Sequence, residues 1–369
     1  MKIRVDKQEF LKNLNTISSI VPAKPVVTII SNIMIEAKKD VLLFSSTDFE
    51  ITMHSEMPAS VAEDGVIVIN AKTIVELVRK LPEGELNISL ANDEVSIKSK
   101  SGVYKMPVIK KDDYVEISRI EKNKMFNVDS LPIKSAVDNS VFAVSRDAVK
   151  VAITGVLLEG AGKNLAFVGT DGHRLALYSI KDIFEKPISN TVIVPPKVLT
   201  ILRDLIDEVD EFSMGFDEKR IMFKVKNIEV WAKLIEGTFP DYKRVIPTDN
   251  NKICIVKKDD LINSLNIVNV FTNPNTRLVK FEIERGKLTI NAYQNQTGEG
   301  TEYMDVDYED KEKLVIGFNN NYLLEILKRI ETENVKFKFK GEMFAVIIEN
   351  EISKVDQEAV YIIMPLRLK

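Results

Sequence analysis

The sequence predicts an α+β fold of three repeated domains, because one strand, helix and meander pattern recurs six times in 369 residues. In each copy a short strand leads into a polar helix start and then into apolar residues at helical spacing. Three copies begin at Ile74, Val198 and Leu323 and place apolar residues at offsets of 0, 3, 4 and 7. Close variants begin at 10, 133 and 261, and successive copies lie 59 to 65 residues apart. Pairs of copies therefore form three units.

The three units predict three domains, spanning residues 1–122, 125–248 and 252–369. A chain of this length suits two or three domains better than one core. The expected boundaries fall in polar stretches near Glu121–Lys124 and Thr248–Lys252. Both linkers are short, so we expect the domains to be held rigidly.

Alternating apolar segments follow each helix and indicate antiparallel hairpins. After the expected helix at 71–81, for example, Leu86, Ile88 and Leu90 alternate with polar residues. Further helices are expected at 196–206 and 319–330, with polar N-cap residues such as Asp6, Asn70 and Asn319 at the helix starts. Helices packed on one face of antiparallel sheets define the α+β class.

Composition indicates a soluble cytoplasmic protein without a membrane anchor. The chain has no apolar run of 18 residues, and its first ten residues, MKIRVDKQEF, are too charged for a signal peptide. The single cysteine, Cys254, fits a reducing compartment and is expected to be a buried small hydrophobe. A net charge of -4 means that any binding to nucleic acid depends on local patches or on topology.

Little in the sequence points to catalysis. Asp171 and His173 could form a carboxylate and histidine pair for a hydrolase, but no nucleophile motif or metal-ligand spacing accompanies them. The Gly-rich stretch at 298–300 lacks the flanking strand and helix of a phosphate loop. We therefore expect no catalytic site, no metal and no cofactor. Gly172, between polar residues, is expected at a turn with positive φ.

Four ordered segments of the chain match the motifs of one known family. They are Thr170–Leu177 (TDGHRLAL), Lys233–Pro247 (KLIEGTFPDYKRVIP), Ile316–Leu324 (IGFNNNYLL) and Tyr361–Leu368 (YIIMPLRL). In these segments the chain resembles the bacterial sliding clamps, the β subunits of DNA polymerase III. The resemblance covers the whole length and agrees with the threefold repeat. It implies the DNA-clamp fold, in which helices line a ring and sheets lie outside.

The resemblance also implies the function and the partners. It implies a non-catalytic processivity factor, a head-to-tail homodimer whose ring encircles duplex DNA without sequence preference. The expected protein partners are the replicative polymerase α subunit, the clamp loader, and other polymerases and repair proteins, which bind through short peptides.

In the family, these peptides occupy a groove that TDGHR borders. Aliphatic and Met side chains suit such a groove, and Arg and His groups suit the polar ends of a peptide. Met343 and Ala345 align loosely and stay outside the expected set. The resemblance places these residues on the groove walls: Ile153, Thr170, Gly172, His173, Arg174, Leu175, Pro240, Arg244, Val245, Ile362, Met364, Pro365, Leu366 and Arg367. The chain carries one residue, Lys369, beyond the family's usual end at Leu368.

Contact with DNA is a separate expectation. By resemblance, Lys24, Arg146 and Lys150 lie at or near DNA-contact positions, and Lys197 lies on a repeated helix. Val151 and Ala152 replace a tyrosine pair of the family, so stacking on exposed DNA ends is not expected. Cations recur on the polar faces of the helices and would give weak, sequence-independent phosphate contacts. They are Lys7, Lys12, Lys72, Arg79, Lys80, Lys134, Lys197, Arg203, Lys257, Lys258, Lys328 and Arg329.

A ring also needs a seam between two copies. By resemblance, an edge strand with Tyr104 and Met106 meets a helix end with Val270 and Phe271. Tyr104 and Phe271 could equally belong to the core. A protein-interaction scaffold that never encircles DNA remains an alternative hypothesis.

Overall fold

The computed structural model describes residues 1–25, 27–111, 114, 125–352 and 354–368. The chain divides into two compact units, Met1–Ser130 with Asp204–Leu234, and Leu131–Arg203 with Ile235–Lys369. The expected linker Glu121–Lys124 lies outside the described residues, whereas Thr248–Lys252 leads into a strand that begins at Lys252. The three domain ranges stay a prediction.

The described residues contain helices where the six repeats place them. Helices α1, α2, α5 and α6 turn apolar residues inward, and α1, for example, buries Phe10, Leu14 and Ile17. The helices are α1 (Lys7–Ser18), α2 (Ala71–Lys80), α3 (Ser130–Asp138), α4 (Pro196–Leu205), α5 (Lys258–Val268) and α6 (Asn320–Leu327). α2 and α4 each end one residue before the expected position, which is within the usual uncertainty of helix ends. α6 ends three residues before the expected position.

Three predicted N-caps are confirmed. The side chain of Asp6 accepts hydrogen bonds from the backbone N–H groups of Gln8 and Glu9. Asn70 and Asn319 accept in the same way at the starts of α2 and α6. These contacts satisfy N–H groups that have no partner inside the helix.

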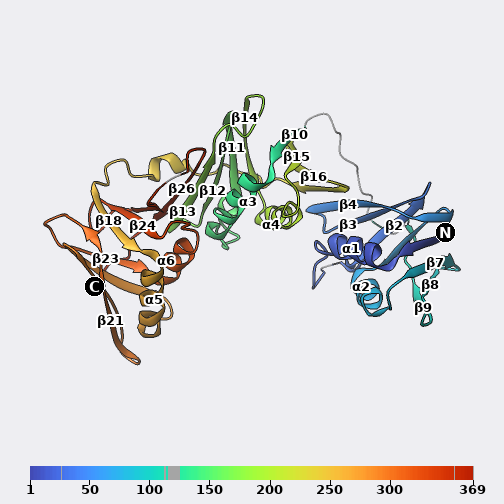
Figure 1. Ribbon diagram of the computed structural model, residues 1–369, viewed down its shortest axis with the longest axis horizontal. Helices are drawn as coiled ribbons and strands as arrows, with labels where there is room; N and C mark the ends of the chain where they lie inside the picture. Colours follow the sequence, from blue (N-terminus) through green and yellow to red (C-terminus); the bar gives the residue numbers. More distant parts are fainter. Residues whose placement is uncertain (26, 112–113, 115–124, 353, 369) are drawn as a thin grey trace. The chain divides into compact units, whose positions relative to one another are not determined.

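The first unit holds two antiparallel sheets. Helices α1 and α2 pack against each other there, and α1 also packs on β3 and β4 (Figure 1). One sheet has the order β5 (Ser60–Glu63), β1 (Lys2–Asp6), β7 (Glu85–Ala91), β8 (Glu94–Lys98), β9 (Val103–Pro107). The other has the order β10 (Met125–Asp129), β15 (Glu211–Phe216), β16 (Arg220–Val225), β17 (Ile228–Lys233), β4 (Ile51–Pro58), β3 (Val41–Thr47), β2 (Asn32–Lys38), β6 (Gly65–Asn70).

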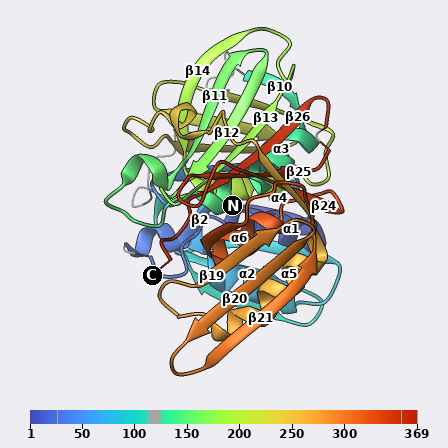
Figure 2. The same cartoon turned by 90° about the vertical axis from the view of Figure 1, so that its left-hand side faces the viewer.

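The second unit also holds two antiparallel sheets. Figure 2 shows β19, β20 and β21 side by side, and α5 packs on β20 and β21. The larger sheet has the order β14 (Ile188–Val194), β11 (Val156–Gly162), β12 (Asn164–Thr170), β13 (Arg174–Ile180), β26 (Gln357–Ile363), β25 (Val346–Asn350), β24 (Asn334–Phe339), β18 (Lys252–Lys257), β22 (Asp307–Tyr308). The smaller has the order β21 (Gly298–Asp305), β20 (Lys287–Gln294), β19 (Leu278–Glu284), β23 (Leu314–Asn319).

Two strand pairs make sheets continuous across the expected domain junctions. β17 pairs with β4, and β13 pairs with β26 over seven residues. In Figure 1, β26 (dark red) lies beside β13 (green). Residues 125–248 are consequently shared between the two compact units, because each of these two larger sheets contains strands from both sides of an expected junction.

Two further expectations concern burial and membranes. Cys254 is 2% exposed, as predicted, and burial raises the pKa of its thiol to about 12. None of the helices in the described part of the chain has the length and apolar character needed to cross a membrane.

Candidate peptide-binding surface

Apolar side chains gather on one face of the larger sheet of the second unit. Cross-strand neighbours produce this cluster, since Leu157 lies opposite both Val168 and Ile193, and Leu175 lies opposite Ile362. We call the following residues the apolar cluster: buried Leu157, Val168, Leu175, Ile193, Tyr242 and Ile362, with partly buried Ala152, Leu177, Ile235, Phe239, Ile246 and Ala345.

The turn between β12 and β13 borders the apolar cluster and carries the TDGHR motif. Gly172 has a φ of 88°, as expected for a turn position that favours glycine. One carboxylate oxygen of Asp171 accepts from the backbone N–H groups of His173 and Arg174, at 2.9 and 3.0 Å. The Thr170 hydroxyl donates to the carbonyl of Arg174 at 2.6 Å. We call residues 170–174 the TDGHR turn, and its own side chains fix its shape.

Two charged residues of the TDGHR turn have different surroundings. His173 is exposed, and its ring stacks on Tyr322 with centroids 6.3 Å apart. Arg174 is only 8% exposed and donates to Asp171, Glu325 and the carbonyl of Phe142. A peptide could therefore reach the imidazole of His173, whereas the guanidinium of Arg174 is already surrounded.

The C-terminal segment Met364–Leu368 runs beside both the TDGHR turn and β23. The backbone N–H of Met364 donates to the carbonyl of His173 at 2.9 Å, and that of Leu366 donates to the carbonyl of Gly317 at 2.8 Å. Gly317 allows this approach, because a Cβ there would lie 2.8 Å from the Leu366 oxygen. Met364 remains 46% exposed. Pro365 and Leu366 are half-buried and Arg367 is exposed, whereas Lys369 lies outside the described residues.

The segment that contains Pro240, Arg244 and Val245 is held against β11 by Glu159. Tyr242 donates to this carboxylate at 2.6 Å, and the ammonium of Lys243 donates at 2.9 Å. Burial acts to raise the pKa of Glu159, but these two hydrogen bonds outweigh it and the pKa is lowered.

The exposed residues of this segment form an open rim. Pro240 is exposed, Val245 is 52% exposed, and Arg244 projects outward to pair with Asp241 at 2.8 Å. The chain therefore presents an exposed valine and a cation beside the buried apolar cluster.

The structure brings most of the expected groove residues into one neighbourhood. Leu175 and Ile362 lie in the apolar cluster, while Ile153 is buried near it at 8% exposure. Sequence reasoning missed the strand residues of the cluster, among them Leu157 and Val168. Their period-two alternation was the available signal, but it also marks every other core strand. Ala345, whose alignment was loose, does pack against the cluster.

The hydrolase hypothesis fails on geometry. The carboxylate of Asp171 accepts from two backbone N–H groups and from Nε of Arg174, at 3.1 Å for the last. The ring of His173 instead stacks on Tyr322. Asp171 therefore does not orient this imidazole as a general base. Within the described ranges, no three His, Cys, Asp or Glu residues lie close enough to hold a metal ion.

The four cations expected to contact DNA are all exposed. Lys24 lies in a loop, Arg146 and Lys150 flank the exposed Val149, and Lys197 lies in the first turn of α4. Among the helix cations, the expectation for Lys7 is wrong. Its side chain is 8% exposed and pairs with Glu83 at 2.7 Å, because the first turn of α1 packs beside the loop after α2.

The residues expected at a dimer seam lie at sheet edges or helix ends. β9 is an outer strand of its sheet, with Tyr104 half-buried and Met106 8% exposed. In the second unit, Val270 is 69% exposed, whereas Phe271 packs against the core and directly over Gly300 of β21. Met106 and Phe271 thus contribute to the interior of their own units as well.

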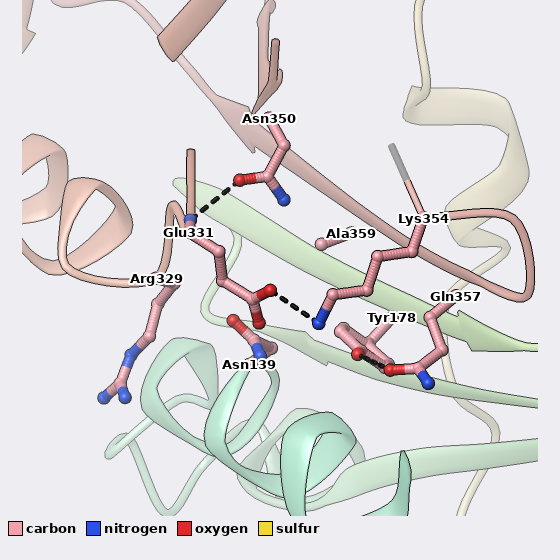
Figure 3. Close-up of a pocket in the computed structure, with 8 residues that line it drawn as sticks. All are labelled: Asn139, Tyr178, Arg329, Glu331, Asn350, Lys354, Gln357 and Ala359. Carbon is pink, nitrogen blue, oxygen red and sulfur yellow. Dashed lines mark hydrogen bonds and ion pairs between the residues drawn. The ribbon is translucent and has the colours of Figure 1, made fainter. Parts of the chain in front are cut away.

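A polar pocket lies where β13 and β26 meet the loops after α6 and β25 (Figure 3). Its groups bond to one another, since Lys354 pairs with Glu331 at 2.6 Å and Tyr178 donates to Gln357 at 2.6 Å. We therefore do not treat it as a ligand site. The pocket is lined by Asn139, Tyr178, Arg329, Glu331, Asn350, Lys354, Gln357 and Ala359.

Comparisons with known proteins identify this arrangement. Family models of the three domains of the DNA polymerase III beta subunit match this chain. The N-terminal domain model matches residues 1–118, the central domain model residues 127–241 and the C-terminal domain model residues 243–367. The beta sliding clamp of Chlamydia pneumoniae is 31% identical over 369 residues, which cover 100% of this chain and 99% of the relative. The beta sliding clamp of Caulobacter vibrioides is 30% identical over 376 residues, which cover 100% of this chain and 100% of the relative.

Solved structures agree. The sliding clamp of Bartonella birtlesii bound to griselimycin has a TM-score of 0.94 at 28% identity, with 100% of both chains covered. The Bacillus subtilis sliding clamp has a TM-score of 0.94 at 25% identity, again over 100% of both chains.

The fold is therefore that of the DNA sliding clamps, with three repeated α+β domains. The chain belongs to the DNA polymerase III beta subunit family. It acts in DNA replication as a sliding clamp, a processivity factor without catalytic activity of its own.

Proposed function

We propose that two copies of this chain assemble head to tail into a ring that encircles duplex DNA. The ring tethers the replicative polymerase α subunit, and other polymerases, repair proteins and the clamp loader bind it through short peptides. The observation that carries this proposal is the match to sliding clamps over the full length of the chain. The domain ranges 1–122, 125–248 and 252–369 belong to the same proposal, as does a place in the bacterial cytoplasm, where the chromosome is replicated.

The edges of two sheets support assembly into a ring. β9 in one unit and β21 in the other are outer strands, so each has backbone groups available for a strand of another chain. Because these edges belong to different surfaces, their contact is heterologous, and two copies close only if the rotation fits. Tyr104 and Met106 on β9 would then meet the helix end that carries Val270 and Phe271.

Exposed cations support contact with DNA. Lys24, Arg146, Lys150 and Lys197 are exposed in a chain whose net charge is -4. Scattered contacts to phosphate are sequence-independent and exchange easily with counterions. Such contacts would permit the ring to slide along DNA, while its closure would prevent dissociation from the DNA.

The apolar cluster and its rim support peptide binding. Buried Leu175 and Ile362 form part of its floor, and exposed Val245 and Met364 stand at its edge. Met is unbranched and adapts to different partners, and the exposed imidazole of His173 can bond a polar group. The Bartonella birtlesii clamp binds griselimycin, so a relative with this fold does take a ligand.

Loading onto nicked circular DNA tests the ring. The clamp loader places the purified protein on the circles, and the protein–DNA complexes are then separated from unbound protein. The DNA in one half of the sample is linearised. We expect the protein to stay on intact circles and to slide off the ends of linear DNA. Retention on both forms would indicate binding by affinity, and retention on neither would favour the scaffold hypothesis.

A further inference from the structure

Arg174 joins the TDGHR turn to α6, a helix about 150 residues further along the chain. Its three guanidinium nitrogens donate to Asp171 at 3.1 Å, to Glu325 of α6, and to the carbonyl of Phe142 at 2.9 Å. The guanidinium carbon also lies 4.5 Å from the ring centroid of Tyr322 and 5.2 Å from that of Phe142. The planar, delocalised Arg group suits both the forked bonding and the aromatic contacts.

The partners of Arg174 are themselves fixed. Phe142 carries a second cation contact from Arg329, at 5.3 Å, and its ring lies 6.1 Å from that of Tyr361. Figure 3 shows the side chain of Arg329 directed away from the Glu331–Lys354 pair. Tyr361, on β26, donates to Asn139 at the end of α3. The surroundings of Arg174 are therefore a packed joint between the two halves of the second unit.

This joint determines where the TDGHR turn and the C-terminal segment lie. Asp171 holds the turn through two backbone N–H groups and also accepts from Arg174, so movement of the guanidinium moves the turn. The carbonyl of His173, one residue before Arg174, accepts from Met364. Leu175, one residue after it, lies in the apolar cluster.

We propose that Arg174 is a positioning residue, which holds the peptide-binding surface in shape through Glu325 and Tyr322 and does not itself touch the peptide. The proposal rests on the peptide-binding function given above. It assigns two residues of α6 to that function, although neither was among the residues expected to bind peptide. A preorganised surface binds better because fewer groups are ordered at the moment of binding.

The test measures binding of a fluorescein-labelled synthetic peptide that carries the clamp-binding motif of the polymerase α subunit from the same organism. The variants are Glu325→Ala and Glu325→Gln in the full chain, with Glu331→Gln as the control. Glu331 is also a paired carboxylate, but its partner is Lys354. Glu325 has a side chain 45% exposed, so both variants are expected to fold.

We expect Glu325→Ala to raise Kd about tenfold, Glu325→Gln to raise it less, and the control to leave it unchanged. The loss of affinity in Glu325→Ala should come from a slower association rate. The same variant should show faster amide hydrogen exchange at residues 172–174 and 364. In a double-mutant cycle, Arg174→Lys and Glu325→Gln should be strongly non-additive.

Two different outcomes would overturn the positioning role of Arg174 and the peptide-binding function of the surface. If both Glu325 variants bind normally and Arg174→Lys alone loses affinity, Arg174 contacts the peptide directly and the positioning role is wrong. If the unmodified protein fails to bind the peptide, the proposed peptide-binding function itself is wrong. Should Glu325→Ala not fold, Glu325→Gln decides between these outcomes by the same measurements.

Discussion

The backbone N–H of Met364 donates a hydrogen bond of 2.9 Å to the carbonyl of His173. This bond places the start of the C-terminal segment beside the TDGHR turn, two parts of the chain that are remote in sequence. The next alternate N–H, that of Leu366, bonds to Gly317 at 2.8 Å. The segment is thus fixed by backbone contacts, and the exposed side chains of Met364 and Arg367 remain available to a ligand.

Removing residues 364–369 should abolish peptide binding and leave the fold and the dimer intact. Strand β26 ends at Ile363, so the sheet keeps all its strands. The lost hydrogen bonds should lower the free energy of unfolding by only about 1 to 3 kcal/mol. Fluorescence anisotropy with a clamp-binding peptide and thermal unfolding measure the two effects. Loss of cooperative unfolding would show that the segment is chiefly structural.

Gly317→Val should weaken peptide binding more than tenfold by displacing the C-terminal segment. A Cβ at this position would lie 2.8 Å from both the Leu366 oxygen and Cδ2 of Leu368, and 2.9 Å from Leu278. Gly341→Ala is the matched control, because its Cβ would make only ordinary contact with Phe344, at 3.5 Å. Equal peptide affinity in the two variants would contradict the importance of the backbone approach.

Cys254 should resist alkylation in the folded protein. Burial raises the pKa of its thiol to about 12, so almost no thiolate exists at neutral pH, and the side chain is 2% exposed. Mass spectrometry after iodoacetamide treatment should find no adduct in the native protein and full modification in guanidinium chloride. Rapid native alkylation would mean that β18 opens frequently.

Glu282 should contribute stability that is lost in acid. Hydrogen bonds from Lys280 and Lys313 lower the pKa of its carboxyl from 4.5 to about 2 in the folded state. A group whose folded pKa is depressed stabilises the protein above its unfolded pKa and loses that effect as pH falls toward the folded value. The loss should therefore occur between about pH 5 and pH 2.

Comparison of Glu282→Gln with the unmodified protein measures this effect by chemical unfolding across that pH window. The difference in unfolding free energy should be largest above pH 5 and should shrink toward pH 2. Glu185→Gln, at an exposed loop position, serves as the control. A difference that stays constant with pH would show that the two lysines do not act through the charge of Glu282.

The sequence by itself determined the helices, their caps and the family of this protein. The 3.6-residue period placed Phe10, Leu14 and Ile17 on one buried face, and short polar side chains marked the starts of α1, α2 and α6. These features depend on residues a few positions apart, so local patterns reveal them. The burial of Cys254 followed from strand alternation in the same way.

Only the tertiary structure decided which remote residues meet. Arg174 pairs with Glu325, Leu366 lies over Gly317, and Lys7 is buried against Glu83 instead of facing solvent. Period and composition place a residue on a face of its own element but do not select the element opposite. For Arg174 and Leu366 that choice depends on the pairing of β13 with β26 and on the packing of α6 beside it, within the second unit. For Lys7 it depends on the packing of the first turn of α1 beside the loop after α2, within the first unit.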